Sequence, residues 1–186
     1  MSHDWPLYRR DSFHLLKNFN ILNPICAEIG VFKGHNAVNM LELHPGMKLH
    51  LIDDYNNMKK DPHTGTKKDV MKEAKTNLAP FNDRITWVNF PSEVAVKSYP
   101  DNFFDYVYID GDHELGIFRD IWDWYPKVKP GMILAGHDVG MWQVKRAFTD
   151  FIDVHHLESW GMLYTASIQS DWWLIKEVPC VNQQKS

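Results

Sequence analysis

The chain lacks the features that mark secreted or membrane-embedded proteins. It has two cysteines, Cys26 and Cys180, whereas a secreted domain of 186 residues would usually carry more. No window approaches the roughly 20 apolar residues that a membrane-spanning helix needs. The polar residues 1–10 also lack the apolar core of a signal peptide. These absences predict a soluble, cytoplasmic protein with no membrane partner.

Positive charge is also scarce. The sequence has 20 Lys and Arg against 24 Asp and Glu, a net charge of −4, and it contains no basic run. A surface that binds nucleic acid normally has a basic patch, so we expect no nucleic-acid partner. The chain has no internal repeat, and its length and its 44% hydrophobic content are typical of one globular domain.

Short apolar runs alternate with amphipathic stretches along the chain. The apolar runs predict strands at residues 25–29, 48–52, 85–88, 104–109, 132–135, 154–158 and 171–176. Helices are predicted at residues 11–19, 34–42, 67–78, 92–97, 115–124 and 142–151, and a turn at residues 129–131. This alternation is typical of βαβ units and predicts an α/β fold with a mostly parallel sheet. We expect a helical extension, one domain and a tail, at residues 1–24, 25–178 and 179–186.

Polar and acidic residues follow several of the predicted strands. In open parallel sheets, ligands bind outside the carboxyl ends of the strands. The residues in these places are Glu28–Gly30, Asp53, Asp110–His113 and His137–Asp138. We therefore expect them to share one rim of the sheet.

The first of these places is a strand-to-helix turn with the pattern E-x-G-x-x-x-G. Gly30 and Gly34 allow the backbone to turn sharply and to pass close to a ligand. Glu28 stands where the dinucleotide pattern G-x-G-x-x-G has its first glycine, and a carboxylate there would repel a pyrophosphate but bind an ammonium. The following helix amino terminus suits a carboxylate. The turn therefore favours S-adenosylmethionine over NAD.

Two further residues suit a nucleoside. Asp53 ends the second predicted strand, where a carboxylate can accept hydrogen bonds from both ribose hydroxyls; the alternative is a solvated loop residue. Ser92 follows the third strand, where it can donate a hydrogen bond to adenine or cap the helix that it begins.

Together these segments resemble a known family. The turn at Glu28–Gly34, Asp53, and the segments Tyr108–His113 and Trp124–Asp138 resemble class I S-adenosylmethionine-dependent methyltransferases. More narrowly they are similar to the methyltransferase domain 24 branch, which is related to sugar and macrolide O-methyltransferases. The resemblance implies a Rossmann-like, doubly wound, seven-stranded sheet with its last strand antiparallel. It also implies methyl transfer to a small-molecule acceptor, with a hydroxyl as the favoured target.

The resemblance also implies a divalent metal, magnesium or manganese. By position, Asp110 is one ligand and also faces the cofactor, and His137 and Asp138 are the other two. His137 departs from the usual Asp, Glu or Asn, because imidazole suits zinc, iron or manganese better than magnesium. Three alternatives stay open: another metal, an orienting role for His137, or no metal. Either Asp112 or His113 would act as the base that takes the acceptor's proton.

Two other functions compete with this interpretation. A non-catalytic domain that binds S-adenosylmethionine or a nucleotide would carry the same turn. A metal-dependent phosphoesterase would explain the paired His and Asp residues, but it needs further His and Asp blocks that the sequence lacks. Tyr55, Trp142 and Trp160 are candidates to line an acceptor pocket or to pack in the core. The short added segments predict an open site, or one completed by a second subunit of a homo-oligomer.

Overall fold

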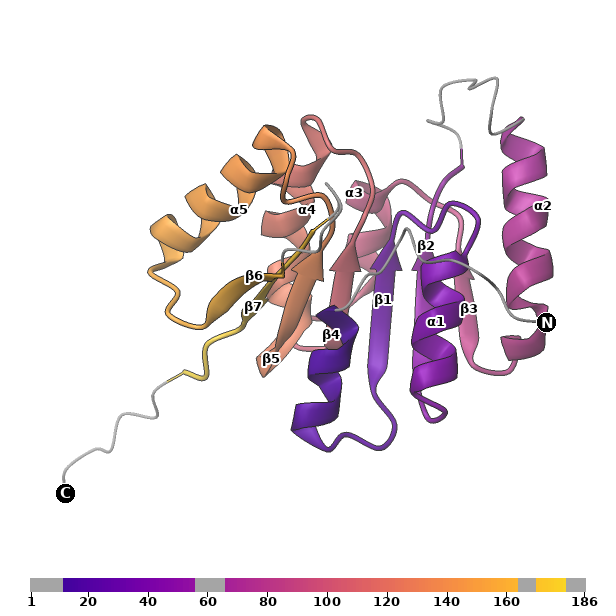
Figure 1. Ribbon diagram of the computed structural model, residues 1–186, viewed down its shortest axis with the longest axis horizontal. Coiled ribbons are helices and arrows are strands. Elements are labelled where there is room, and N and C mark those ends of the chain that lie inside the picture. Colours follow the sequence, from indigo (N-terminus) through magenta and orange to yellow (C-terminus); the bar gives the residue numbers. More distant parts are fainter. Residues whose placement is uncertain (1–11, 56–65, 164–169, 180–186) are drawn as a thin grey trace.

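Seven strands form one mixed sheet in the computed structural model, which describes residues 12–55, 66–163 and 170–179 (Figure 1). The strands are β1 (Ile25–Ile29), β2 (Lys48–Ile52), β3 (Ile85–Val88), β4 (Phe104–Ile109), β5 (Val128–Gly136), β6 (Trp160–Leu163) and β7 (Asp171–Ile175). Their order is β3-β2-β1-β4-β5-β7-β6, and β7 is antiparallel to both of its neighbours. The predicted fold class is confirmed.

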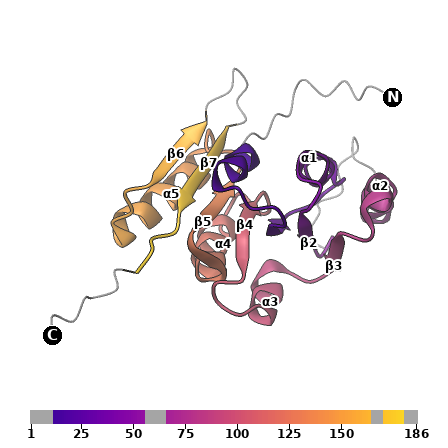
Figure 2. The same ribbon diagram turned by 90° about the horizontal axis from the view of Figure 1, so that it is seen from below.

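Helices cover both faces of the sheet. They are α1 (His35–Leu43), α2 (Lys67–Leu78), α3 (Ser92–Ala95), α4 (Gly116–Trp124) and α5 (Trp142–His155), with 3₁₀ helices η1 (Ser12–Phe19), η2 (Ala79–Phe81), η3 (Val96–Ser98) and η4 (Tyr125–Lys127). Figure 2 shows α1 and the indigo helix η1 on one side, and α3 and α4 on the other. α5 packs against α4. None of the described helices is long and apolar enough to cross a membrane.

The alternation of side chains along β4 produces a separate apolar core on each face. Val107 and Ile109 belong to the core beneath α4 and α5, whereas Tyr106 and Tyr108 belong to the core beneath α1 and η1. All six residues of β4 are buried, as expected of a central parallel strand. Burial of each large apolar side chain stabilises the fold by about 2 kcal/mol. The sheet that carries the site is therefore rigidly supported from both sides.

The structure corrects three sequence predictions. The predicted strand at residues 154–158 is wrong, because α5 continues to His155 and the strand begins at Trp160. His156 ends the helix in a left-handed conformation, with φ of 53°. The turn predicted at residues 129–131 lies inside β5 as an irregularity of register, with Gly131 at φ of 77°. The first predicted helix is a 3₁₀ helix from Ser12, and residue 11 lies outside the described residues.

A buried polar network ties η1 to the far end of the chain. The backbone N–H of Ser12 donates to Oδ2 of Asp171 at 2.8 Å, and its hydroxyl lies 2.7 Å from the hydroxyl of Tyr106. The Tyr108 hydroxyl donates to Oδ1 of Asp171 at 2.9 Å. Helix η1 is therefore packed into the domain. The proposed domain boundaries stay a prediction, and the tail from residue 180, including Cys180, lies outside the described residues.

Candidate active site

The carboxyl ends of the central strands meet at one rim, as the sequence predicted. Each residue that follows a strand bonds to the end of the neighbouring strand. The N–H of Gly30 donates to the carbonyl of Ile52 at 2.9 Å, and the N–H of Asp110 to the carbonyl of Ile29 at 2.7 Å. The N–H of His137 donates to the carbonyl of Ile109 at 3.0 Å. These bonds fix the starting points of the turn, the Asp110 loop and the His137 loop beside one another.

The glycine turn has the backbone that its glycines permit. Gly30 and Gly34 have φ of 87° and 77°, a region that disfavours side chains. A Cβ on Gly30 would overlap the backbone carbonyl of Asp110, and one on Gly34 would lie 2.7 Å from the Leu78 side chain. Glycine is therefore required at position 30 and favoured at position 34, and the turn lies directly against the Asp110 loop.

Asp53 holds this turn in place. Its Oδ2 accepts the N–H groups of Val31 and Phe32 at 2.9 and 3.0 Å, and its Oδ1 accepts the N–H of Tyr55 at 2.8 Å. Burial raises the pKa of the Asp53 carboxyl, although the backbone hydrogen bonds oppose that shift. Oδ2 already accepts two N–H groups, whereas Oδ1 accepts one and has a second lone pair, so a ribose contact through Oδ1 is compatible with these bonds and stays a prediction.

Glu28 is joined by a residue that the sequence analysis missed. The Asn36 side-chain amide donates to Oε1 of Glu28 at 2.8 Å, and both side chains are buried. The Asn36 Oδ1 atom is buried without a hydrogen-bond partner. Asn36 stands in the first turn of α1, two residues after Gly34, and a polar residue on the buried face of that turn was the available signal. The Asn36 amide therefore lies beside the Glu28 carboxylate, for which the sequence predicted no partner.

Ser92 makes contacts that the sequence did not predict. Its hydroxyl donates to Oδ1 of Asp120 at 2.5 Å and accepts the indole N–H of Trp124 at 2.7 Å. The predicted cap is wrong, because Pro91 is the N-cap residue and no side chain caps the helix. Burial raises the pKa of Asp120 to about 6. The hydroxyl proton of Ser92 is directed at Asp120, and a contact with adenine stays a prediction.

Asp110, His137 and Asp138 come together with one donor atom each, all within 4.8 Å of one another. Nδ1 of His137 lies 3.0 Å from Oδ1 of Asp138 and 3.6 Å from Oδ1 of Asp110. His113 approaches the same two carboxylates, with Nε2 3.0 Å from Oδ2 of Asp138 and 3.6 Å from Oδ1 of Asp110. We call these four residues the His–Asp cluster. Within this cluster, the donor atoms of Asp110, His137 and Asp138 are close enough to one another to hold a divalent cation.

The electrostatics of the cluster are strongly coupled. The carboxylates of Asp110 and Asp138 raise the pKa of His113 to about 10, against the opposite effect of burial. Burial alone would raise the pKa of Asp138, but His113 and His137 outweigh it and hold that pKa below its usual range. Asp138 also has a φ of 58°, a conformation that Asp tolerates better than most residues. Such concentrations of charge and backbone strain are typical of functional sites.

The two candidate bases have different surroundings. Both oxygens of Asp112 accept backbone N–H groups, from Glu114 at 2.9 Å and from Gly116 at 3.2 Å. Gly116 begins α4, so Asp112 supports the start of this helix. His113 instead points its Nε2 toward the carboxylates of the cluster. The structure therefore places His113, but not the bonded oxygens of Asp112, within the cluster.

The three aromatic residues predicted to line an acceptor pocket or to pack in the core differ in their exposure and contacts. Tyr55 is buried and packs with Val70 and Ala74, so it is a core residue. Trp142 is 68% exposed and begins α5, four residues after Asp138. Trp160 is half-exposed on β6 and contacts the ring of Phe148. Of the three, Trp142 is closest along the chain to the His–Asp cluster.

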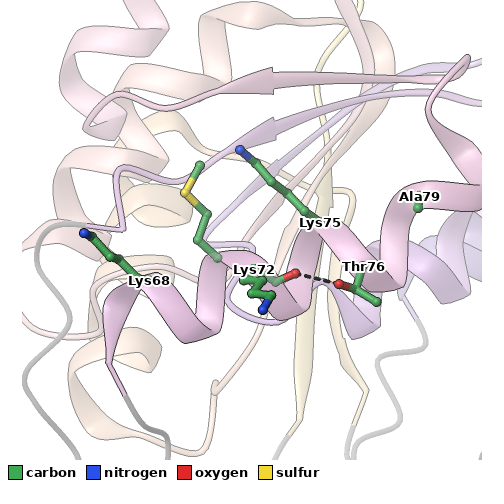
Figure 3. Close-up of a pocket in the computed structure, with 6 residues that line it drawn as sticks. Lys68, Lys72, Lys75, Thr76 and Ala79 are labelled. Carbon is green, nitrogen blue, oxygen red and sulfur yellow. Dashed lines mark hydrogen bonds between the residues drawn. The ribbon is translucent and has the colours of Figure 1, made fainter.

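A cavity of about 530 Å³ lies away from these residues, on the surface of α2. Its lining consists of Lys68, Met71, Lys72, Lys75, Thr76 and Ala79. Figure 3 shows the lysines spaced along the helix and the hydrogen bond from the Thr76 hydroxyl to the carbonyl of Lys72, at 2.9 Å. Since none of the rim residues lines it, this cavity is separate from the candidate site.

The strand order, the glycine turn and the acidic rim define a class I S-adenosylmethionine-dependent methyltransferase. A family model described as a methyltransferase domain matches residues 27–139, which is more than half of the chain. The chain therefore belongs to this methyltransferase family, as the sequence indicated. No curated protein matches the chain.

Solved structures share the fold at low sequence identity. Cofactor-bound Rv0187 from MTB is 15% identical with a TM-score of 0.66, over 93% of this chain and 83% of that one. The tRNA (m1A58) methyltransferase TrmI from Aquifex aeolicus is 14% identical with a TM-score of 0.63, over 96% and 72%. An O-methyltransferase family protein from Burkholderia thailandensis is 11% identical with a TM-score of 0.60, over 90% and 55%. The fold is thus shared by enzymes with different acceptors.

Proposed function

We propose that this methyltransferase transfers the methyl group of S-adenosylmethionine to a hydroxyl of a small-molecule acceptor. The observation that carries the proposal is the contact between the glycine turn and the Asp110 loop, where a Gly30 side chain would overlap the Asp110 carbonyl. Because the turn lies against Asp110 of the His–Asp cluster, a methyl donor bound at the turn would lie beside a methyl acceptor bound at the cluster.

The turn offers a complementary group for each end of the cofactor. The N-terminus of α1 suits the methionine carboxylate, and Glu28 with its partner Asn36 suits the ammonium. Asp53 lies at the end of β2, where the ribose hydroxyls would reach it, and Ser92 lies beyond β3 toward the expected place of adenine. Asp110 would face both the cofactor and the acceptor.

The surroundings of the cluster favour an acceptor with an apolar body. Leu115, two residues after His113, is 81% exposed, and Trp142 is 68% exposed. Met141, between Asp138 and α5, is also exposed, and its N–H donates to the Asp138 carbonyl. Solvent-exposed apolar side chains on both segments that carry the cluster would contact a hydrophobic or aromatic molecule.

The chemistry required of the chain is alignment and removal of one proton. The sulfonium S–CH₃ bond breaks as the acceptor O–CH₃ bond forms, which leaves S-adenosylhomocysteine and releases the hydroxyl proton. Asp110, His137 and Asp138 would hold a divalent cation, which when bound lowers the pKa of an acceptor hydroxyl. Asp112 or His113 would then receive the proton, and the rim would align oxygen and methyl group.

Calorimetric titration with S-adenosylhomocysteine tests the cofactor part of this proposal. We expect the wild type to bind and Asp53→Ala to lose binding, because the turn loses two backbone hydrogen bonds, Tyr55 loses a third, and the carboxylate is removed. Asp83→Ala, at an exposed position after η2, is the matched control and should bind like the wild type. A wild type that binds no S-adenosylhomocysteine would overturn the proposal.

A methyl-transfer assay tests the acceptor part. Labelled S-adenosylmethionine is incubated with a panel of phenols, catechols and sugars, and with RNA as the contrasting acceptor. We expect label on oxygen of a small molecule. Label on RNA alone would refute the small-molecule acceptor, and binding of cofactor without transfer to any substrate of the panel would favour a non-catalytic binding domain.

A further inference from the structure

We propose that His113 is a fourth metal ligand, so that the His–Asp cluster selects a transition ion such as Mn²⁺ over Mg²⁺. This inference deepens the proposed function and rests on it for the role of the bound metal. It assigns His113 to the metal, which leaves Asp112 to receive the acceptor's proton. The ligand set would comprise Asp110, His113, His137 and Asp138, with two nitrogen donors.

The first observation concerns the atoms that surround Nε2 of the His113 ring. Its Nε2 atom is buried and has carboxylate oxygens of Asp138 and Asp110 at 3.0 and 3.6 Å. Neither contact has the geometry of a hydrogen bond, so the nitrogen has no hydrogen-bond partner. A buried nitrogen that faces two carboxylates without a hydrogen bond to either is placed to bind a cation that those carboxylates also bind.

The second observation comes from His137, which is only 2% exposed. Both of its ring nitrogens are buried without a hydrogen-bond partner, although Nδ1 has Asp138 and Asp110 oxygens at 3.0 and 3.6 Å. A buried polar group left without a partner costs about 1–3 kcal/mol. A cation bound by Nδ1 would remove that cost for one nitrogen and would also separate the neighbouring negative charges.

The third observation is the pattern of the distances. Both rings approach Oδ1 of Asp110 at 3.6 Å, and each approaches a different oxygen of Asp138 at 3.0 Å. Donor atoms about 2.1 Å from one ion lie about 3.0 Å apart in an octahedron and about 3.4 Å apart in a tetrahedron. The two 3.0 Å contacts have the spacing of neighbouring ligand atoms, and the two 3.6 Å contacts are slightly longer, so His113 would have to move slightly to join the three residues whose donor atoms already lie within 4.8 Å of one another.

The donor types determine which ion fits. Mg²⁺ prefers oxygen ligands and retained waters, whereas imidazole is a good ligand for Mn²⁺, iron and zinc. One imidazole among oxygens biases a site weakly, but two would make the preference measurable. The comparison of Mn²⁺ with Mg²⁺ is the informative one, because both ions accept octahedral oxygen sites and differ in how well they accept nitrogen.

The test measures Mn²⁺ and Mg²⁺ affinity of the metal-stripped full chain, with His113→Gln as the key variant. Gln keeps a polar side chain but removes the imidazole. We expect the ratio of Mn²⁺ to Mg²⁺ affinity to fall by at least about tenfold, the lower end of the losses seen when a metal site loses a supporting group. His44→Gln is the matched control, because His44 also has a buried Nε2 without a partner and lies at the end of α1. It should keep the wild-type ratio.

Pulsed electron paramagnetic resonance on the Mn²⁺-loaded wild type gives a second readout that needs no variant. We expect hyperfine coupling from two imidazole nitrogens, falling to one in His113→Gln. Coupling from one nitrogen or none in the wild type, or an unchanged affinity ratio in His113→Gln, would overturn the inference.

Titration with S-adenosylhomocysteine in the same samples separates this inference from the proposed function. A protein that binds S-adenosylhomocysteine but shows no Mn²⁺ preference would retain the proposed function and contradict the metal assignment. A protein that binds Mn²⁺ through two nitrogens but no S-adenosylhomocysteine would support the metal assignment and contradict the proposed function.

Discussion

Asp120 makes the stability of this protein depend on pH in a direction opposite to that of most carboxylates. The side chain is 5% exposed on α4, and its Oδ1 accepts the Ser92 hydroxyl at 2.5 Å. Burial is the largest cause that raises its pKa from 3.8 to about 6, and the nearby carboxylates of Asp123 and Glu93 add to it. The Ser92 hydrogen bond opposes the shift because it stabilises the charged form.

The size of the effect follows from this shift. A difference of about 2 pKa units at about 1.4 kcal/mol per unit corresponds to about 3 kcal/mol. Below pH 3.8 the carboxyl is protonated in both the folded and the unfolded chain and contributes nothing. As the pH rises toward 6, the unfolded chain ionises first, so the free energy of unfolding decreases. Above pH 6 the full cost of the buried charge is present.

Urea unfolding of the wild type and Asp120→Asn between pH 4 and 8 tests this reasoning. Asn has nearly the same shape, can still accept the Ser92 hydrogen bond and does not ionise. The variant should gain about 2–3 kcal/mol relative to the wild type between pH 4 and 7, since a small part of the full effect is already present at pH 4 and the other titrating groups are common to both chains and cancel. Ser92→Ala, in a chain that keeps Asp120, should enlarge the pH dependence of the free energy of unfolding, because it removes the hydrogen bond that stabilises the charged Asp120 carboxylate. A stability difference that is constant across this pH range would refute the argument.

Three further predictions follow from single contacts. Gly30→Ala should abolish binding of S-adenosylhomocysteine in a calorimetric titration, because its Cβ would overlap the Asp110 carbonyl and displace the turn; wild-type affinity would contradict this. Tyr108→Phe should lower the free energy of urea unfolding by about 1–2 kcal/mol, because the buried Asp171 carboxylate loses a donor; unchanged stability would show that the hydroxyl contributes nothing. Trp142→Ser should raise the acceptor KM at least several-fold with unchanged stability and cofactor affinity, since the ring is 68% exposed and Trp142 begins α5, four residues after Asp138; an unchanged KM would exclude it from the acceptor site.

The sequence alone determined the architecture and the rim. The alternation of apolar strands and amphipathic helices predicted the parallel sheet, because the strand and helix periods are local properties of the chain. The residues that follow β1, β2, β4 and β5 then had to meet, since parallel strands end at the same edge. The family resemblance supplied the antiparallel last strand. The one misplaced strand fell where α5 runs on to His155, because its last turn has an alternating pattern as well.

Only the tertiary structure decided which side chains contact one another. Ser12 and Asp171 are 159 residues apart and meet because η1 packs against β5 and β7. Ser92 was expected at a helix cap, but α4 brings Asp120 and Trp124 within hydrogen-bond distance of it. Asp112 and His113 are neighbours with the same apparent suitability as a base. Asp112 accepts the backbone amides of Glu114 and of Gly116, the first residue of α4, whereas Nε2 of His113 lies 3.0 Å from Asp138 in the cluster. Such choices depend on the packing of distant segments, which local sequence patterns do not record.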